Sequence, residues 1–180
     1  MRRSLVAALI AVLAAIPVFA ALPDGAQAPD FSTAASLGGK EFKFSLAAAL
    51  KKGPVVLYFY PEAFTPGCTV EAHQFAEATA HFQQLGATVI GVSHDAIEKL
   101  DRFSVLECRN KFAVASDVDG KIMKAYDAVL PQEPSYANRT SYVIAPTGKI
   151  LYSYTAMNPD KHVENTLTAV KKWQDAQKKS

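Results

Sequence analysis

The fold is decided by the stretch Val55-Val56-Leu57-Tyr58-Phe59-Tyr60-Pro61-Glu62-Ala63-Phe64-Thr65-Pro66-Gly67-Cys68. Its first six residues are β-branched, aliphatic or aromatic, which is typical of a strand buried on both faces of a sheet. Pro61 ends this run, and Thr65-Pro66 predicts the start of a helix, because proline fits the first helical position. Ligand sites of open α/β sheets lie at such strand-to-helix junctions. We therefore expect the functional residues to begin between positions 61 and 68.

Outward from this stretch, apolar strands and helices alternate along the chain. The expected elements are the helix from Thr65 to a stop at Gly86, strands at 88–93 and 113–115, helices at 96–108 and 121–126, a hairpin of 140–145 and 150–154, and a last helix at 159–177. Residues 23–40, rich in Pro, Gly, Ala and Ser, are expected to form an extended lead-in. This order predicts a fold of the α/β class with a thioredoxin-like plan, in which one domain of residues 21–180 forms a central mixed β-sheet with helices on both faces.

Composition and charge exclude several classes of protein. Pro and Gly together are close to average usage in the 180 residues, which excludes collagen-like and low-complexity disordered chains. The chain has 19 basic and 17 acidic residues, and without Arg2 and Arg3 both numbers are 17. A neutral domain offers no basic surface to a polyphosphate backbone, so we expect no nucleic-acid partner.

Residues 1–20 predict a secretory signal peptide. A positively charged start precedes the twelve apolar residues 5–16, and small residues follow Pro17. Cleavage after Ala20 predicts export, to the periplasm, with no stable membrane insertion afterwards. The alternative is an uncleaved anchor, since the apolar residues 5–22 reach the lower limit of a membrane span. Pro17 and the small residues favour cleavage.

Cys68 is the residue of this junction whose chemistry depends most on its position. With Thr65 as the N-cap and Pro66 as the first helical residue, Cys68 is expected at the third helical position. Unpaired N–H groups and the positive end of the helix dipole favour a thiolate there. Gly67, without a side chain, would let a substrate approach the backbone. A lone cysteine is more often a buried apolar residue, and the first-turn position is what favours a reactive one.

The spacing of Pro61, Thr65 and Cys68 resembles the P-x-x-x-T-x-x-C motif of peroxiredoxins. The run Thr-Pro-Gly-Cys-Thr-Val-Glu that ends at Glu71 is similar to the form of the Q-type, or bacterioferritin-comigratory-protein-like, branch. Three further segments are similar to the family's opening segment, its first core strand and the strand of its active-site arginine, namely 25–31, 55–61 and 139–144. The resemblance implies a thiol peroxidase on a thioredoxin-like fold, with no metal or organic cofactor.

The resemblance also implies how the residues act. The thiolate of Cys68 attacks hydrogen peroxide or an organic hydroperoxide and becomes a sulfenic acid, which a thioredoxin-like or small-thiol reductant removes. Arg139 donates from a planar guanidinium and favours the thiolate, and Thr65 accepts from the peroxide while donating elsewhere. Backbone N–H groups of Gly67 and Cys68 stabilise the developing charge, and Glu71 either orients Arg139 or simply favours the helix dipole.

The second thiol departs from the family pattern. Many members of the Q-type branch carry a resolving cysteine at the position of His73, which cannot resolve a sulfenic acid. The remaining candidate is Cys108, 40 residues after Cys68 and expected at the end of the second helix, whereas the family's usual position is nearer Ser104. Three interpretations stay open, in this order: a resolving thiol, a free thiol in the core, and a structural Cys68–Cys108 disulfide, which export would permit.

Two other functions compete with the peroxidase. An exported thioredoxin-like thiol-disulfide oxidoreductase would need C-x-x-C at the helix start, where this chain has Thr65 before Cys68. A non-catalytic binding domain held by a Cys68–Cys108 disulfide is the other alternative. For the peroxidase we expect a monomer or weak dimer. Its peroxide would pass Tyr60 and Phe64, which either form an apolar collar that admits organic hydroperoxides or only pack the core.

No metal site is predicted. Four histidines lack the spacing of metal ligands and are expected to be ordinary polar positions, namely His73, His81, His94 and His162.

Overall fold

The computed structural model describes residues 21–179. The predicted signal peptide falls on residues 1–20 and lies outside the described part of the chain. Among the described residues, no helix is long and apolar enough to cross a membrane.

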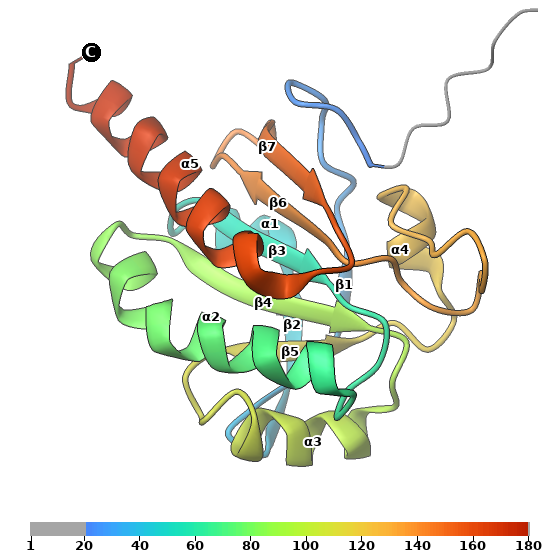
Figure 1. The fold of residues 1–180 in the computed structure, drawn as a ribbon. Coiled ribbons are helices and arrows are strands. Elements are labelled where there is room, and N and C mark those ends of the chain that lie inside the picture. Colours follow the sequence, from blue (N-terminus) through green and yellow to red (C-terminus); the bar gives the residue numbers. More distant parts are fainter. Residues whose placement is uncertain (1–20, 180) are drawn as a thin grey trace, which may run out of the picture.

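The described chain forms a sheet of seven strands flanked by helices (Figure 1). The strands are β1 (Ser32–Leu37), β2 (Lys40–Ser45), β3 (Val55–Phe59), β4 (Thr88–Ser93), β5 (Ala113–Ser116), β6 (Thr140–Ile144) and β7 (Ile150–Thr155). The helices are α1 (Leu46–Leu50), α2 (Pro66–Gln84), α3 (Ile97–Leu106), α4 (Lys121–Ala125) and α5 (His162–Gln177), and a 3-10 turn, η1 (Pro159–Lys161), precedes α5.

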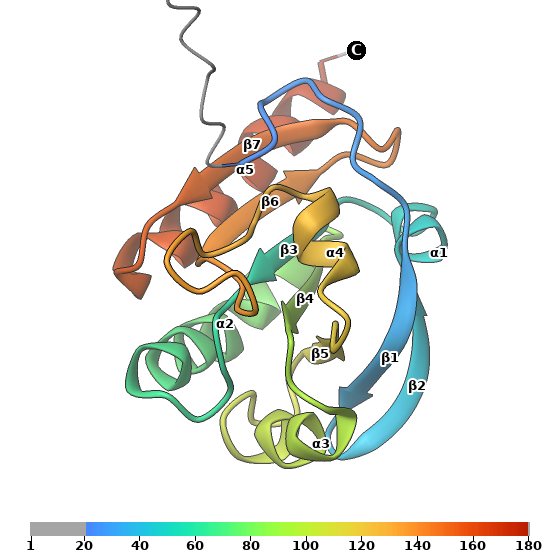
Figure 2. The same ribbon diagram turned by 90° about the vertical axis from the view of Figure 1, so that its right-hand side faces the viewer.

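The sheet is mixed, in the order β2-β1-β5-β4-β3-β6-β7. Strands β3, β4 and β5 run parallel, and β1, β6 and β7 pair antiparallel with their neighbours. One hydrophobic core joins the sheet to α1 and α4, and the other joins it to α2, α3 and α5, so helices cover both faces (Figure 2). The predicted fold class is confirmed.

Strand β3 explains why the deciding stretch is apolar without a break. All five of its residues are buried. Val55, Leu57 and Phe59 face the core under α1 and α4, while Val56 and Tyr58 face the core under α2 and α3. Because both faces are covered, neither set of alternating residues can be polar.

The prediction of an extended lead-in is wrong for residues 32–40. Residues 32–45 form the β1–β2 hairpin, and α1 follows it directly. Gly38 and Gly39 make the turn with φ of 57° and 74°, values that suit glycine. Strand β1 is rich in Ala and Ser, which favour strands weakly, so its pairing with β5 rather than its own propensity holds it in the sheet.

The helix predicted at 96–108 is shorter in the structure. Helix α3 ends at Leu106, so Cys108 lies in the turn that follows it rather than on the helix. Arg109 and Asn110 there have φ of 51° and 57°, and these left-handed residues reverse the chain towards β5.

Candidate active site

The first turn of α2 carries the predicted nucleophile. The helix begins at Pro66 with Thr65 as its N-cap, so Cys68 is the third helical residue, as predicted. The hydroxyl of Thr65 makes no capping hydrogen bond and instead donates to the carbonyl oxygen of Glu62 at 3.0 Å. Its oxygen lone pairs are therefore still available as acceptors. Cys68 is nearly buried, with 2% of its surface exposed.

Arg139 reaches Cys68 from the neighbouring strand. It directly precedes β6, whose Thr140 is paired with Phe59 at the end of β3, and this register brings its side chain to the start of α2. Its Nη2 donates to Cys68 Sγ at 3.4 Å, and its Nε donates to the carbonyl of Met157 at 2.9 Å. Burial by itself would lower the pKa of Arg139, but Glu71 and Cys68 together raise the pKa above its ordinary value. The guanidinium is thus charged and fixed.

Gly67 has a role that the sequence did not suggest. A Cβ added at this position would lie 3.1 Å from Arg139 Nη2. That approach is tight, so the missing side chain leaves room for the guanidinium beside Cys68. The predicted reason for Gly67 was close approach of a substrate.

A buried carboxylate anchors the other side of Arg139. Glu71, one turn after Cys68, accepts a hydrogen bond from Arg139 Nη1, and both side chains are almost fully buried. Burial raises the pKa of Glu71 to about 7, although Arg139 opposes the shift. Of the two predicted roles for Glu71, the contact with Arg139 is the one that the structure shows.

His162 completes this network and was missed from the sequence. It was expected to be an ordinary polar residue, but its ring is fully buried at the start of α5. Nε2 donates to the carbonyl of Ala156 at 2.9 Å, so Nδ1 is free to accept from the Ser141 hydroxyl at 2.8 Å. Nδ1 also lies 3.7 Å from Glu71 Oε1, an oxygen without a hydrogen-bond partner. Burial lowers the pKa of His162 to about 4, with Arg139 acting in the same direction, so the ring is neutral near pH 7.

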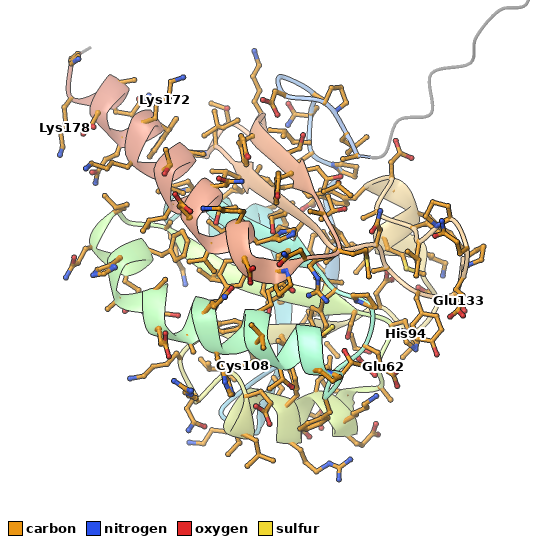
Figure 3. The ribbon with its side chains drawn as sticks, viewed as in Figure 1. Glu62, His94, Cys108, Glu133, Lys172 and Lys178 are labelled. Atoms are coloured by element: carbon orange, nitrogen blue, oxygen red, sulfur yellow. The ribbon has the colours of Figure 1, made fainter. Side chains whose placement is uncertain are left out.

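The loop between β3 and α2 is held by polar residues that follow β4. Asp95 accepts from the backbone N–H of Ala63 at 2.7 Å, and Lys99 bridges Asp95 and Glu62 with two contacts of 2.7 Å. The carbonyl of Pro61 accepts from His94 at 3.1 Å, and Glu62 and His94 lie together near the start of α2 (Figure 3). The ends of adjacent parallel strands share one edge of the sheet, and that rule would have found residues 93–99 from the sequence.

Cys108 has different surroundings from Cys68. It is fully buried in the same hydrophobic core, which also contains aromatic residues of β3 and α3. Figure 3 labels it between α2 and α3. Burial raises its pKa well above the ordinary value, and the neighbouring charge of Glu107 adds to the rise. Both cysteines are free thiols. Within residues 21–179, no three His, Cys, Asp or Glu side chains are grouped as a metal ion would require.

Comparison with known proteins identifies the family of this chain. The model of the AhpC/TSA family matches residues 25–153. This chain belongs to the AhpC/TSA family. It is a peroxiredoxin, and its activity is that of a thiol peroxidase.

Its relatives also support the assignment to the Q-type branch of the peroxiredoxins. Peroxiredoxin Bcp of Xanthomonas campestris is 29% identical over 123 residues, covering 65% of this chain and 76% of the relative. The chloroplastic peroxiredoxin Q of Sedum lineare is 33% identical over 118 residues, covering 65% of this chain and 63% of the relative. The crystal structure of peroxidoxin BcpB from Mycobacterium tuberculosis superposes with a TM-score of 0.74 at 28% identity, covering 83% of this chain and 96% of that one. The resemblance to the Q-type peroxiredoxins is confirmed.

Proposed function

We propose that Cys68 is the peroxide-reducing thiol of this peroxiredoxin, with Arg139 and Thr65 as its catalytic partners. The observation that carries the proposal is the 3.4 Å contact between the Arg139 guanidinium and Cys68 Sγ in the first turn of α2. The positive charge and the N–H groups of that turn both stabilise a thiolate. The contact also places a donor where the peroxide oxygens must lie.

The proposed reaction begins when the Cys68 thiolate attacks one peroxide oxygen. A sulfur–oxygen bond forms as the oxygen–oxygen bond breaks, and the leaving oxygen departs as hydroxide or alkoxide and takes up a proton. The Thr65 hydroxyl already donates to Glu62, so it is oriented to accept from the peroxide. Arg139 and the N–H groups of Gly67 and Cys68 stabilise the charge as it moves to the leaving oxygen.

Pro61 and Glu71 support this reaction without touching the reacting atoms. Glu71 and the Met157 carbonyl fix two edges of the Arg139 guanidinium, so that Nη2 alone faces Cys68. Pro61 lies two residues after the end of β3, and its carbonyl anchors the loop to His94. Both are positioning residues, since their contacts fix the catalytic groups.

The proposed substrates are hydrogen peroxide and organic hydroperoxides. The apolar surface beside the N-cap supports the second class. Phe64 is 38% exposed, packs edge-on against Phe103 at 5.2 Å, and has the Arg102 guanidinium 5.9 Å from its ring. Of the two predicted collar residues, Phe64 is at the surface and Tyr60 is fully buried.

The proposed second step is resolution of the Cys68 sulfenic acid by Cys108. Both thiols are free and belong to one hydrophobic core. Attack of Cys108 sulfur on Cys68 sulfur forms the disulfide, and the displaced hydroxide combines with the Cys108 proton as water. A thioredoxin-like or small-thiol reductant then reduces the disulfide.

The proposed function is tested by hydrogen peroxide consumption in the presence of dithiothreitol or thioredoxin. We expect consumption to depend on both the peroxide and the thiol. Reduction of insulin disulfides by the same protein, assayed in parallel, should be negligible. Insulin reduction without peroxide consumption would instead favour the thiol-disulfide oxidoreductase, and inactivity in both assays would favour a binding domain.

We also propose that the protein is exported, to the periplasm. The support is the pattern of residues 1–20, with its positive start, apolar centre and small residues. Expression of the full chain in a Gram-negative host, followed by fractionation and intact-mass measurement, tests this. A periplasmic form that begins at Ala21 is expected, and a cytoplasmic form that keeps Met1 would contradict it.

A further inference from the structure

The turn that carries Cys108 is attached to helix α2 on both sides of the cysteine. Glu107 accepts from His73 Nε2 at 2.6 Å, and Arg109 donates to Glu77 at 3.2 Å. His73 and Glu77 are four residues apart, so they lie on the same side of α2 in successive turns. The two residues that flank Cys108 are therefore each bound to the helix whose first turn holds Cys68.

The backbone of the same turn is also closed. The N–H of Cys108 donates to the carbonyl of Phe103 at 3.0 Å, and the N–H of Asn110 donates to that of Ser104 at 3.0 Å. The Cys108 carbonyl in turn accepts from Lys111 at 2.9 Å. Cys108 is thus fixed by main-chain hydrogen bonds as well as by the two side-chain pairs.

The first turn of α2 has little support for its helical backbone from its own residues. The N-cap side chain of Thr65 makes no capping hydrogen bond, Pro66 has no N–H, and Gly67 favours helix weakly. Phe64, just before it, has φ of 69°, an unfavourable value for an aromatic residue. Of the two cysteines, Cys68 is therefore the one whose backbone is easier to displace.

We propose that His73 and Glu77, through Glu107 and Arg109, are positioning residues for the resolving step. They hold the turn of Cys108 fixed against α2, while the first turn of α2 unwinds and carries the Cys68 sulfenic acid to Cys108. Both pairs lie beyond the first turn, so they persist when that turn opens. This inference rests on the proposed resolving role of Cys108 and deepens it.

The test separates the two chemical steps by acid quenching and intact-mass measurement after one equivalent of hydrogen peroxide. The first step appears as the gain of one oxygen at Cys68, and the second as loss of that oxygen with two hydrogens, as water. The variants are Glu77→Arg, Arg109→Glu, the double charge swap of both, and His73→Leu. Lys121→Glu is the matched control, because Lys121 pairs with Asp119 on the surface at the start of α4, which packs on the other face of the sheet from α2 and α3.

The expected result is a slower second step with an unchanged first step. Exposed ion pairs are weak, so each single change at Glu77 or Arg109 should slow disulfide formation about threefold, and His73→Leu about tenfold because its pair is more buried. The charge swap should restore the rate to within about twofold of wild type, since it rebuilds the pair. Lys121→Glu should leave both steps unchanged.

Three results would overturn the inference. The first is an unchanged second step in all variants. The second is a double charge swap that forms the disulfide as slowly as Arg109→Glu. That result would mean that the charge beside Cys108 matters and the attachment to α2 does not. The third is a wild-type protein that oxidises at Cys68 without forming the disulfide, which would remove the resolving role while leaving the peroxidase intact. Failure of Cys68 to oxidise at all would instead refute the proposed function.

Discussion

Cys68 and Cys108 share one hydrophobic core, yet their surroundings differ in almost every physical respect. Cys68 lies at the positive end of α2 and contacts the charged guanidinium of Arg139. Cys108 lies after the end of α3 among aromatic rings, and burial raises the pKa of its thiol. With Cys68 as the proposed peroxide-reducing thiol, the contrast teaches that burial alone need not make a cysteine inert, because buried donors and positive charge favour a thiolate.

The largest expected effect comes from removing the sulfur of Cys68. Cys68→Ser should reduce peroxide consumption to the background level, because the hydroxyl is a far poorer nucleophile than the thiolate. Cys108→Ser should still reduce one equivalent of peroxide and then stall as the sulfenic acid. Both are measured by hydrogen peroxide consumption with and without dithiothreitol. If Cys68→Ser kept substantial turnover, the assignment of the two cysteines would be wrong.

The buried network of Glu71, Arg139 and His162 beside Cys68 should also make the free energy of unfolding depend on pH. Burial lowers the pKa of His162 from 6.5 to about 4, so the unfolded chain takes up a proton at higher pH than the folded one. The stability that the neutral ring contributes is complete above pH 6.5 and is lost as the pH falls towards 4. We expect the free energy of unfolding of wild type to fall over that range by up to about 3 kcal/mol more than that of His162→Gln.

Urea unfolding at several pH values measures this difference. Glu71 acts in the opposite sense, because its pKa is raised from 4.5 to about 7 and its contribution is lost as the pH rises through that window. Because Glu71 lies 3.7 Å from His162 Nδ1, the comparison reports the ring together with its contact to Glu71. Parallel pH profiles for wild type and His162→Gln would show that the ring is not held neutral by the fold.

A smaller effect is expected from changing the donor geometry at Cys68. Arg139→Lys keeps a positive charge but loses the planar fork that contacts Cys68, Glu71 and the Met157 carbonyl together. We expect kcat/KM for hydrogen peroxide to fall by about tenfold or more, with the fold retained. Steady-state kinetics measured beside a thermal melt would separate a loss of catalysis from a loss of stability. Unchanged kinetics would place Arg139 outside the reaction.

The smallest effect concerns the hydrophobic core that contains Cys108, where the Tyr58 hydroxyl is buried without a hydrogen-bond partner. Tyr58→Phe keeps the stacking on Phe75, with ring centroids 4.4 Å apart, and removes the unpaired group. We expect the free energy of unfolding to rise by about 1 kcal/mol. Tyr142→Phe is the matched control, since the Tyr142 hydroxyl is bonded to the backbone of Leu22 and Tyr126, and it should destabilise. A loss of stability in Tyr58→Phe would contradict the contrast.

Much of the fold could be predicted because its signals are local. The unbroken apolar run of β3 and the Thr65-Pro66 start of α2 are properties of adjacent residues, and they position Cys68 without further information. The β1–β2 hairpin could not be found in this way. Its Ala- and Ser-rich first strand is stabilised by pairing with β5, a contact between residues far apart in the sequence.

The same distinction holds for the site. The Glu71–Arg139 contact was foreseen as one of two roles, because a motif drew attention to each residue. His162 was missed because its significance comes from burial against Glu71 and Ser141, which no spacing in the sequence reveals. The pairs that flank Cys108 were missed for another reason: α3 ends earlier than its periodicity indicated, so residues 107–109 lie in a turn that contacts α2.

The most direct test of the difference between the two cysteines is to identify which one a limiting peroxide oxidises first. Reduced wild type is mixed with less than one equivalent of hydrogen peroxide and an excess of dimedone, which traps sulfenic acids, and the tryptic peptides are analysed by mass spectrometry. The polar surroundings of Cys68 predict the adduct on the peptide that contains Cys68, with none on the peptide that contains Cys108. An adduct on Cys108, with Cys68 left as a thiol, would contradict the account.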